Sequence, residues 1–296
     1  MPLDAIMGWS GPVSGGFGAR LCAAVEALGP LCVGIDPHGP LLEKWGLVDD
    51  AEGLARFADA CLDALAGHVA LVKPQSAFFE RHGSRGIAVL ERLLGGFAGT
   101  STLVLLDVKR GDIGSTMTAY AHAYLSQDSP LRADAITVSP FLGFESLRPA
   151  LDLAHGCGRG LFVLALTSNR EGAQVQHATH DGRTVAASIV DGVTTQNAAE
   201  AGAGVLGSVG MVIGATVGEA VQKLGLDLGA ANAPLLAPGV GAQGATADDL
   251  RTVFGPALGN VLASSSREIL GAGPDGAALR AAARHTAQQL NVILGR

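Results

Sequence analysis

The 296-residue sequence predicts an α/β protein of the (β/α)8 TIM-barrel class. Eight short apolar segments of strand length alternate with segments of helical periodicity along the chain. Polar residues recur where these strands end, and in a barrel every strand exit faces the same rim. A doubly wound sheet also alternates strands and helices, but it usually has fewer strands. We therefore expect a single barrel over residues 17–296 whose polar strand exits form one pocket.

The strands are predicted from short apolar runs, several of which end at a charge or a proline. Residues 1–16, rich in Gly, Ser and Pro, precede them and are expected to form a mobile leader. The eight predicted strands are 31–35, 69–72, 103–106, 135–138, 161–166, 209–213, 234–237 and 260–263.

Apolar residues at helical spacing predict the segments between the strands. The longest connection, 170–208, has this spacing at Val185, Ile189 and Val193, so it is not structureless. We expect Ser115 or Gly114 to cap the helix that follows the third strand. The other predicted helices lie at about 17–28, 54–65, 86–97, 115–125 and 277–293, and one begins near Thr246.

Composition excludes several classes of protein. Apolar residues make up 48% of the chain and charged residues 16%, as in a well-covered α/β enzyme. A net charge of −7 without a Lys/Arg cluster argues against a nucleic-acid partner. No apolar run approaches the roughly 20 residues of a membrane span, and no secretory signal opens the chain. We therefore expect a cytoplasmic protein without a membrane partner.

Three further patterns do not support cofactor or metal binding. Residues 202–207 match G-x-G-x-x-G, but they precede a predicted strand instead of following one and opening a helix. His177 and His180 are three residues apart with no clear third ligand, so a solvated loop is the better interpretation. The four cysteines lack metal-binding spacing and are interpreted mostly as small buried hydrophobes: Cys22, Cys32, Cys61 and Cys157.

The third strand ends in the most concentrated group of charges. Asp107 and Lys109 follow the apolar run 103–106, and in extended chain they point to the same side, about 6.6 Å apart. Gly111 allows a turn that would bring Asp112 back toward them. Taken alone, such a pattern is more often a strand-end ion pair than a catalytic centre.

A phosphate site is predicted after the last two strands. The loop 238–244 contains three glycines that let backbone N–H groups approach a ligand, and the next helix directs its positive end to the rim. Ser264, Ser265, Ser266 and Arg267 add hydroxyls and a guanidinium after strand eight. These two loops form the recurrent phosphate site of such barrels.

Several segments, in the same order, resemble the orotidine 5′-phosphate decarboxylase family, specifically its longer bacterial class. The resemblance covers nearly the whole chain from Phe17. It implies a cofactor-free barrel, usually a homodimer, that converts orotidine 5′-phosphate to UMP and CO2 in pyrimidine synthesis. The matching segments are LCVGIDPH (31–38), VKPQ (72–75), DVKRGDIG (107–114), LTSN (166–169) and PGVGAQG (238–244).

The resemblance also implies roles for residues of this chain. Lys109 corresponds to the proton donor to C6 of the pyrimidine and Asp107 to the carboxylate facing the substrate carboxylate, while Lys73 and Asp112 complete the charge array. Asp112 and Thr116 are implied to reach the partner subunit's site. The implied substrate contacts are Asp36, Lys73, Asp112 and Thr116 at the ribose, Ser168 at the base, Gln243 between base and phosphate, and Arg267 with the loop that begins at Pro238 at the phosphate.

Two alternatives remain open. A related sugar-phosphate decarboxylase or aldolase would act through Mg²⁺, but those relatives carry an acidic ligand where this chain has Lys73, which repels a cation. A non-catalytic phosphate-binding barrel would not need four charges in a closed cleft. The expanded segment 170–208 departs from the shorter family members, so the contacts that would cover the base are less defined than the charged residues.

Overall fold

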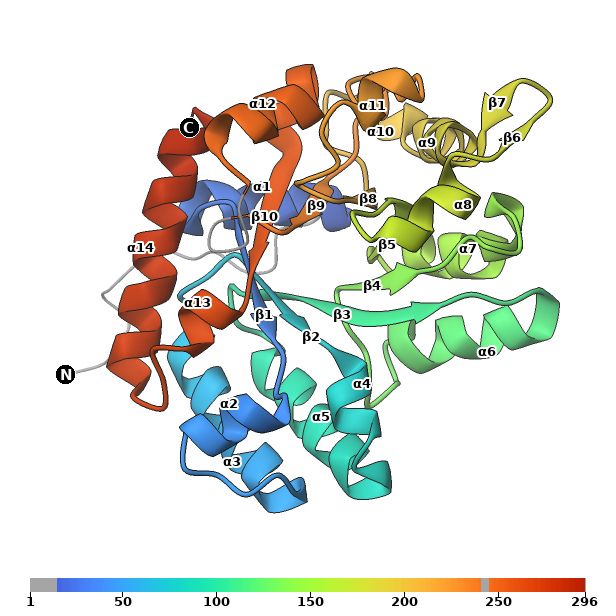
Figure 1. The fold of residues 1–296 in the computed structure, drawn as a ribbon. Coiled ribbons are helices and arrows are strands. Elements are labelled where there is room, and N and C mark those ends of the chain that lie inside the picture. The colour runs from blue at the N-terminus through green and yellow to red at the C-terminus, as the bar shows by residue number, and fades with distance from the viewer. Residues whose placement is uncertain (1–14, 241–244, 296) are drawn as a thin grey trace.

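The computed structural model describes residues 15–240 and 245–295, and it contains a closed barrel of parallel strands (Figure 1). The order around the barrel is β1-β10-β9-β8-β5-β4-β3-β2, which confirms the predicted fold class and excludes the open doubly wound sheet. The barrel strands are β1 (Leu31–Ile35), β2 (Leu71–Pro74), β3 (Leu103–Arg110), β4 (Ala135–Val138), β5 (Gly160–Leu166), β8 (Val209–Ile213), β9 (Leu235–Pro238) and β10 (Val261–Ser265).

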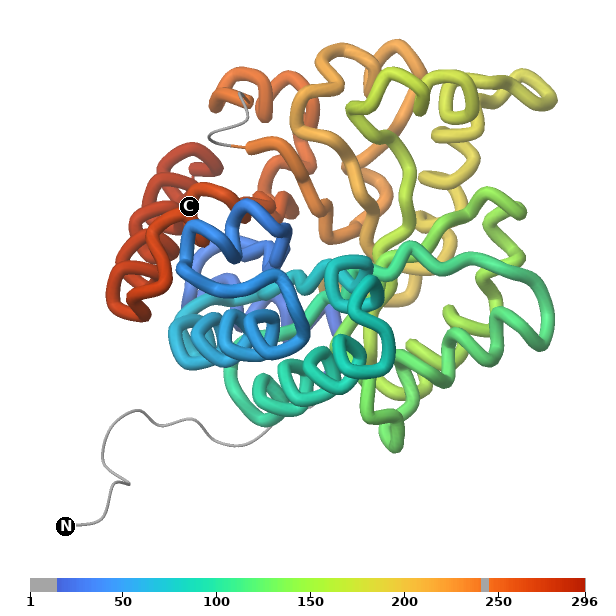
Figure 2. The backbone as a smooth tube through the Cα atoms, turned by 60° about the horizontal axis from the view of Figure 1, so that its bottom comes forward, coloured from blue at the N-terminus to red at the C-terminus, as the bar shows by residue number. Residues whose placement is uncertain are grey.

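Helices surround the barrel, and the last of them packs beside an early one, so the ring of helices closes as the sheet does (Figure 2). This pair is α14 (Gly276–Leu294) and α3 (Ala51–Leu65). The others are α1 (Phe17–Leu28), α2 (Gly39–Lys44), α4 (Ser76–Glu80), α5 (Gly83–Phe97), α6 (Gly114–Leu125), α7 (Arg148–Gly156), α8 (Ala173–Gln176), α9 (Val185–Gln196), α10 (Ala198–Gly202), α11 (Ala220–Lys223), α12 (Ala247–Phe254) and α13 (Arg267–Leu270). Short 3₁₀ turns span Phe144–Leu147, Arg170–Gly172 and Gly255–Asn260.

Helix α1 closes the bottom of the barrel. Its Phe17 is fully buried and packs edge-on against Phe162 of β5, with ring centroids 6.0 Å apart. Gly160 makes room for that ring, since a Cβ atom there would overlap Phe17. The interior is therefore filled at the amino ends of the strands, and the opposite, carboxyl end remains as the place for a site.

Several predicted boundaries shift in the structure. Strand β2 does not stop before Lys73: it continues through Pro74, which pairs with Ile35 of β1. Strand β3 extends to Arg110, and its register with β4 shifts between Leu106 and Arg110. The third-strand segment is therefore bulged at its end instead of uniformly extended.

The predicted cap of α6 is wrong. Ile113 occupies the N-cap position, and its side chain makes no capping hydrogen bond. By contrast, the helix predicted near Thr246 does begin there, and Thr246 and Asp249 form a capping box. Gly114 and Ser115 are the first two residues of α6, one and two positions too late to be the N-cap residue.

The long connection after β5 contains the predicted helix as α9, together with α8 and a hairpin of β6 (Thr179–His180) and β7 (Arg183–Thr184). His180 lies on this exposed hairpin. Gly202 is the last residue of α10, and residues 203–207 lie between α10 and β8, so the glycine motif precedes a strand as predicted. Of the cysteines, Cys32 and Cys61 are buried, whereas Cys22 and Cys157 are only partly buried.

Residues 1–14 of the predicted leader lie outside the described residues. Within residues 15–240 and 245–295, no helix combines the length and apolar character that a bilayer crossing requires.

Candidate active site

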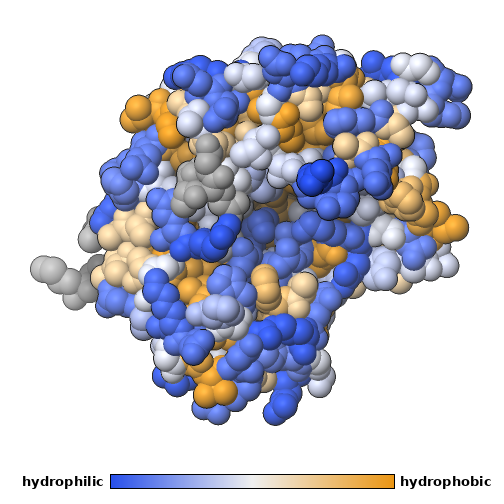
Figure 3. Space-filling view, in the orientation of Figure 1, coloured by the Kyte–Doolittle hydropathy of each residue, from blue (hydrophilic) through white to orange (hydrophobic). Residues whose placement is uncertain are grey.

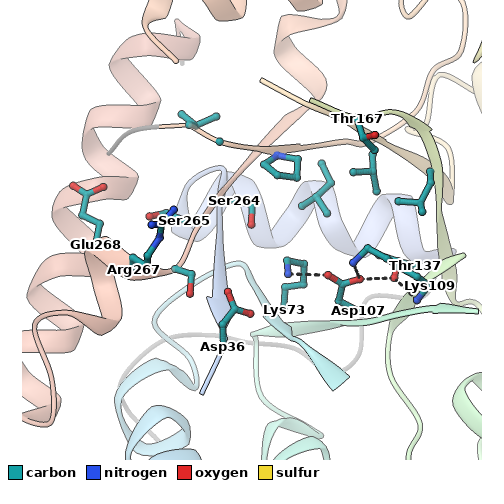
Figure 4. Close-up of a pocket in the computed structure, with 17 residues that line it drawn as sticks. Asp36, Lys73, Asp107, Lys109, Thr137, Thr167, Ser264, Ser265, Arg267 and Glu268 are labelled. Carbon is teal, nitrogen blue, oxygen red and sulfur yellow. Dashed lines mark hydrogen bonds and ion pairs between the residues drawn. The ribbon is translucent and has the colours of Figure 1, made fainter. Parts of the chain in front are cut away.

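The Asp107 carboxylate lies at the centre of a hydrogen-bonded group at the carboxyl end of the barrel (Figure 4). Its Oδ2 accepts from Lys73 Nζ at 3.1 Å and from Gln75 Nε2 at 2.8 Å. Its Oδ1 accepts from Lys109 Nζ at 2.6 Å and from Thr137 Oγ1 at 2.7 Å. Each oxygen thus receives one ammonium and one neutral donor, which occupies the roughly four lone-pair sites of the carboxylate.

Neighbouring strands bring these side chains together. Lys73 is in β2, Asp107 and Lys109 are in β3, and Thr137 is in β4. Lys109 has a positive φ of 45°, in the left-handed region that few non-glycine residues adopt. The local bulge, and not an extended strand, therefore places the Lys109 ammonium against Asp107.

Burial and charge act against each other on this group. Burial by itself would raise the pKa of Asp107, but Lys73 and Lys109 outweigh it and hold that pKa at about 2. Burial would likewise lower the pKa of Lys73, but Asp107 and Asp36 hold it above its usual range. Asp107 is therefore an anion and Lys73 a cation at neutral pH.

Asp36 is a second carboxylate of the same cavity. It follows β1, and its Oδ1 atom is buried without a hydrogen-bond partner among the residues that the structure describes. An unpaired buried acceptor is costly, so this oxygen is suited to receive a donor from a ligand. Its charge also helps to keep Lys73 protonated.

The cavity that contains these charges has a volume of about 440 Å³ and extends across the barrel mouth to the ends of β9 and β10. Figure 3 shows hydrophilic residues gathered around a hollow near the middle of this face. In Figure 4, Arg267 lies across the cavity from Lys109. The far wall consists of Pro238, Gly239, Val240, Ser264, Ser265, Ser266, Arg267 and Glu268.

The helix that is expected to direct its N-terminus to this far wall carries acidic residues of its own in its first turn. Thr246 accepts the Asp249 amide, and the Asp249 carboxylate accepts the Thr246 amide at 2.7 Å. The first turn of α12 also carries Asp248. Two amides at the helix end are thus already engaged within a capping box, and its acidic residues weaken the attraction of this end for an anion.

The structure gathers some predicted site residues and separates others. Lining the cavity are Asp36, Lys73, Asp107, Lys109, Pro238 and Arg267. Ser168 is exposed at the exit of β5 and is not among the lining residues. Gln243 lies outside the described residues.

Asp112 and Thr116 lie away from the cavity of their own chain. Gly111 approaches the next loop closely, since a Cβ atom there would overlap the Ser139 carbonyl oxygen. The Asp112 carboxylate accepts the Ile113 amide at 2.8 Å, and Thr116 is exposed on α6. The turn after β3 therefore does not bring Asp112 back to Asp107 and Lys109.

Comparison with known proteins assigns the family. The profile of the orotidine 5′-phosphate decarboxylase / HUMPS family matches residues 29–282. A Salinispora arenicola protein named orotidine 5′-phosphate decarboxylase is 62% identical over 268 residues, which span 90% of this chain and 94% of that protein. Its namesake from Streptomyces coelicolor is 56% identical over 279 residues, spanning 94% of this chain and 98% of that one. The chain belongs to the orotidine 5′-phosphate decarboxylase / HUMPS family.

Solved structures agree with this assignment. A crystal structure from Streptomyces avermitilis, provisionally given the decarboxylase name, is 53% identical, with a TM-score of 0.90 over 98% of this chain and 100% of that one. The Leishmania donovani OMP decarboxylase structure is 28% identical, with a TM-score of 0.70 over 95% of this chain and 100% of that one. The decarboxylase family barrel therefore extends over nearly the whole chain.

Sequence reasoning missed two residues of the hydrogen-bonded group around Asp107. Gln75 belongs to a matched segment but was assigned no role, and Thr137 was interpreted only as part of a buried strand. Gln75, at the exit of β2, and Thr137, in β4, both donate a hydrogen bond to Asp107. Pairing between neighbouring strands, which places Gln75 beside Asp107, is the signal that could have found Gln75.

The Mg²⁺-dependent alternative would need a free carboxylate ligand, and Asp107 does not provide one. Both oxygens of Asp107 are already engaged by donors, two of which are ammonium groups. Binding a hard cation there would require displacing those donors and tolerating Lys73 beside the metal. Over the residues that the structure describes, no group of three or more His, Cys, Asp or Glu side chains is arranged to hold a metal.

Proposed function

We propose that this chain catalyses decarboxylation of orotidine 5′-phosphate to UMP and CO2 in pyrimidine biosynthesis, without a metal or other cofactor. The observation that carries the proposal is the Asp107 carboxylate between the Lys73 and Lys109 ammonium groups, in a cavity whose far wall contains Arg267. The named relatives at 56–62% identity support the same reaction.

The proposed chemistry uses Lys109 as the acid. The bond between C6 and the carboxylate breaks, its electron pair stays on C6, and CO2 leaves. The Lys109 ammonium stabilises this developing negative charge and then transfers a proton from Nζ to C6. Asp107 faces the substrate carboxylate and keeps both lysines oriented. The neutral Lys109 finally regains a proton from water.

The remaining cavity residues fit a nucleotide in this proposal. Arg267 and the loop beginning at Pro238 bind the phosphate, and Asp36 accepts a ribose hydroxyl through its unpartnered oxygen. When substrate is bound, Ser168 contacts the base, and Gln243 bridges the base and the phosphate. Contacts remote from C6 can stabilise the transition state by holding the closed, aligned complex.

We further propose a homodimer in which Asp112 and Thr116 complete the partner's site. These two residues flank Ile113, whose exposed fraction is 62% although it is apolar. Phe141 and Leu142 on the next loop are 75% and 54% exposed. Because Gly111 contacts Ser139, the two loops are adjacent, and such an apolar surface beside the site is suited to a second copy of this chain.

Two competing functions have weaker support. A metal-dependent sugar-phosphate reaction needs a free carboxylate cluster, whereas Asp107 is fully engaged. A non-catalytic phosphate-binding barrel would have no need of a buried Asp107 paired with two lysines, because burying charges is costly. The decarboxylase proposal uses each of these charges.

The deciding experiment is release of CO2 from orotidine 5′-phosphate by purified protein, with and without EDTA. We expect equal rates in both samples and stoichiometric UMP. Activity that disappears in EDTA and returns with Mg²⁺ would favour the metal-dependent reaction. Binding of the nucleotide without CO2 release would favour the non-catalytic barrel.

A further inference from the structure

Thr137 bonds both to the backbone of Lys109, the proposed proton donor, and to Asp107, the partner of the Lys109 ammonium. It is 1% exposed, near the end of β4. Its Oγ1 accepts the backbone N–H of Lys109 at 2.9 Å and donates to Oδ1 of Asp107 at 2.7 Å. That same Oδ1 accepts the Lys109 ammonium at 2.6 Å. One hydroxyl therefore joins both ends of the Lys109 residue through a closed set of hydrogen bonds.

The backbone of Lys109 explains why such a support is needed. Its φ of 45° is in the left-handed region, which is strained for a residue with a Cβ atom. The pairing of β3 with β4 is interrupted between Leu106 and Arg110, so no regular ladder fixes Lys109. At this interruption, the Thr137 hydroxyl accepts a hydrogen bond from the Lys109 backbone N–H.

We propose that Thr137 is a positioning residue for the decarboxylation, and this inference rests on the function proposed above. Its hydroxyl holds the left-handed turn at Lys109 and fixes the Asp107 carboxylate that orients the ammonium. Gln75 does not share this role: it donates to the other oxygen, Oδ2, and bonds through its backbone to Ile35. Thr137 thus acts on the acid that protonates C6 and leaves the phosphate and ribose contacts unchanged.

The test is Thr137→Val, which keeps the side-chain shape and removes the hydroxyl. Since small misplacements of a reacting group reduce rates strongly, we expect kcat to fall about 10- to 100-fold while KM stays within about 2-fold. Thr137→Ser retains the hydroxyl and should restore most of kcat. If Thr137→Val does not fold, Thr137→Ala takes its place, and we expect the same fall in kcat.

Thr102 provides a matched control at the other end of β3. It is 2% exposed, and its Oγ1 accepts the Gly67 amide at 2.9 Å and donates to the Val69 carbonyl at 2.7 Å. Thr102→Val therefore removes a buried hydroxyl with similar bonding, far along the strand from the site. We expect a lower unfolding midpoint but a wild-type kcat.

Three outcomes would overturn the proposal: wild-type kcat in Thr137→Val, no recovery in Thr137→Ser, or an equal loss of kcat in Thr102→Val. A crystal structure of Thr137→Val gives a readout independent of turnover. We expect Lys109 to leave the left-handed region and its ammonium to move from Asp107, and an unchanged Lys109 would contradict the proposal. A wild-type protein that releases no CO2 would instead refute the proposed function, whatever Lys109 does in that structure.

Discussion

The Nζ atom of Lys109 lies 2.6 Å from Oδ1 of Asp107, although 47% of the lysine side chain is exposed and only 7% of the aspartate side chain is. A buried, hydrogen-bonded carboxylate therefore anchors an ammonium that is open to the cavity. This asymmetry suits a lysine that must both remain oriented and give its proton to a ligand.

Replacement of this lysine tests its role as the acid. We expect Lys109→Ala to lower kcat for orotidine 5′-phosphate by about 10²- to 10⁴-fold, because general acid catalysis and stabilisation of the carbanion are both lost. Lys223→Ala is a suitable control, since Lys223 is an exposed lysine paired with Glu219 at 3.0 Å on the outer helix α11. Full turnover by Lys109→Ala would exclude the proton-donor role.

The lowered pKa of Asp107 predicts a contribution to stability that depends on pH. The folded pKa of about 2 lies below the unfolded value of 3.8, so the unfolded state binds this proton more readily. The contribution is present above pH 3.8 and is lost as the pH falls through about 2. The shift corresponds to about 2 kcal/mol of unfolding free energy.

Denaturant unfolding of the wild type and of Asp107→Asn measures this contribution. We expect the variant to be less stable at pH 7, because two lysines then face a neutral amide. The difference in unfolding free energy should shrink as the pH is lowered from 5 toward 2. A difference that stays constant over this range would show that Asp107 is not the group responsible.

Arg267 is expected to act through the substrate phosphate. Loss of a charge-assisted hydrogen bond in Arg267→Ala should lower kcat/KM for orotidine 5′-phosphate about 10- to 100-fold. The nucleoside orotidine lacks the phosphate, so its kcat/KM should be low in the wild type and unchanged by the substitution. Steady-state kinetics with both substrates make the comparison.

Arg251→Ala is the matched control for this prediction, because Arg251 is an exposed arginine of α12 paired with Asp248 at 2.7 Å. It should leave both substrates unaffected. If Arg267→Ala instead impairs orotidine and its phosphate equally, Arg267 acts on the structure of the cavity and not on the phosphate.

The proposed shared site predicts complementation between subunits. Asp112→Ala and Lys109→Ala homodimers should each be nearly inactive. A heterodimer formed by subunit exchange contains one intact site, with Lys109 from one chain and Asp112 from the other, so CO2 release should partly return.

Mixing Lys109→Ala with Lys73→Ala is the control for complementation, because both residues come from the same chain and every site stays defective. Recovery in this control would indicate residual wild-type protein. A verified Asp112/Lys109 heterodimer without activity would place Asp112 in its own subunit's site, or in no site.

Much of the architecture was predictable from the sequence. Apolar runs and helical spacing are local properties, so all eight barrel strands are present, and seven of them lie within about two residues of their predicted bounds, while β3 ends four residues later. The predicted helices are present within about three residues, but several short helices were not predicted. The order of strand exits placed Lys73, Asp107 and Lys109 at one rim, because parallel strands of a barrel end on the same side.

The details of the site depended on contacts between strands. Thr137 and Asp107 are 30 positions apart, and Gln75 and Asp107 are 32 apart, so no local pattern reveals their hydrogen bonds. The left-handed turn at Lys109 likewise arises from an interrupted register with β4. The acidic residues of α12 were visible in the sequence, but only the folded helix shows that Asp249 and Thr246 form a capping box at its start.

The amino-acid sequence by itself thus determined the succession of strands and helices that is typical of a barrel and the charges at the strand ends, since these are local features of the chain. Only the tertiary structure decided which donors surround Asp107, how Lys109 turns toward it, and that Asp112 lies away from the cavity of its own chain. The physical reason is that register and closure set the distances between side chains that are remote in sequence, and hydrogen bonds and charges act only at those distances.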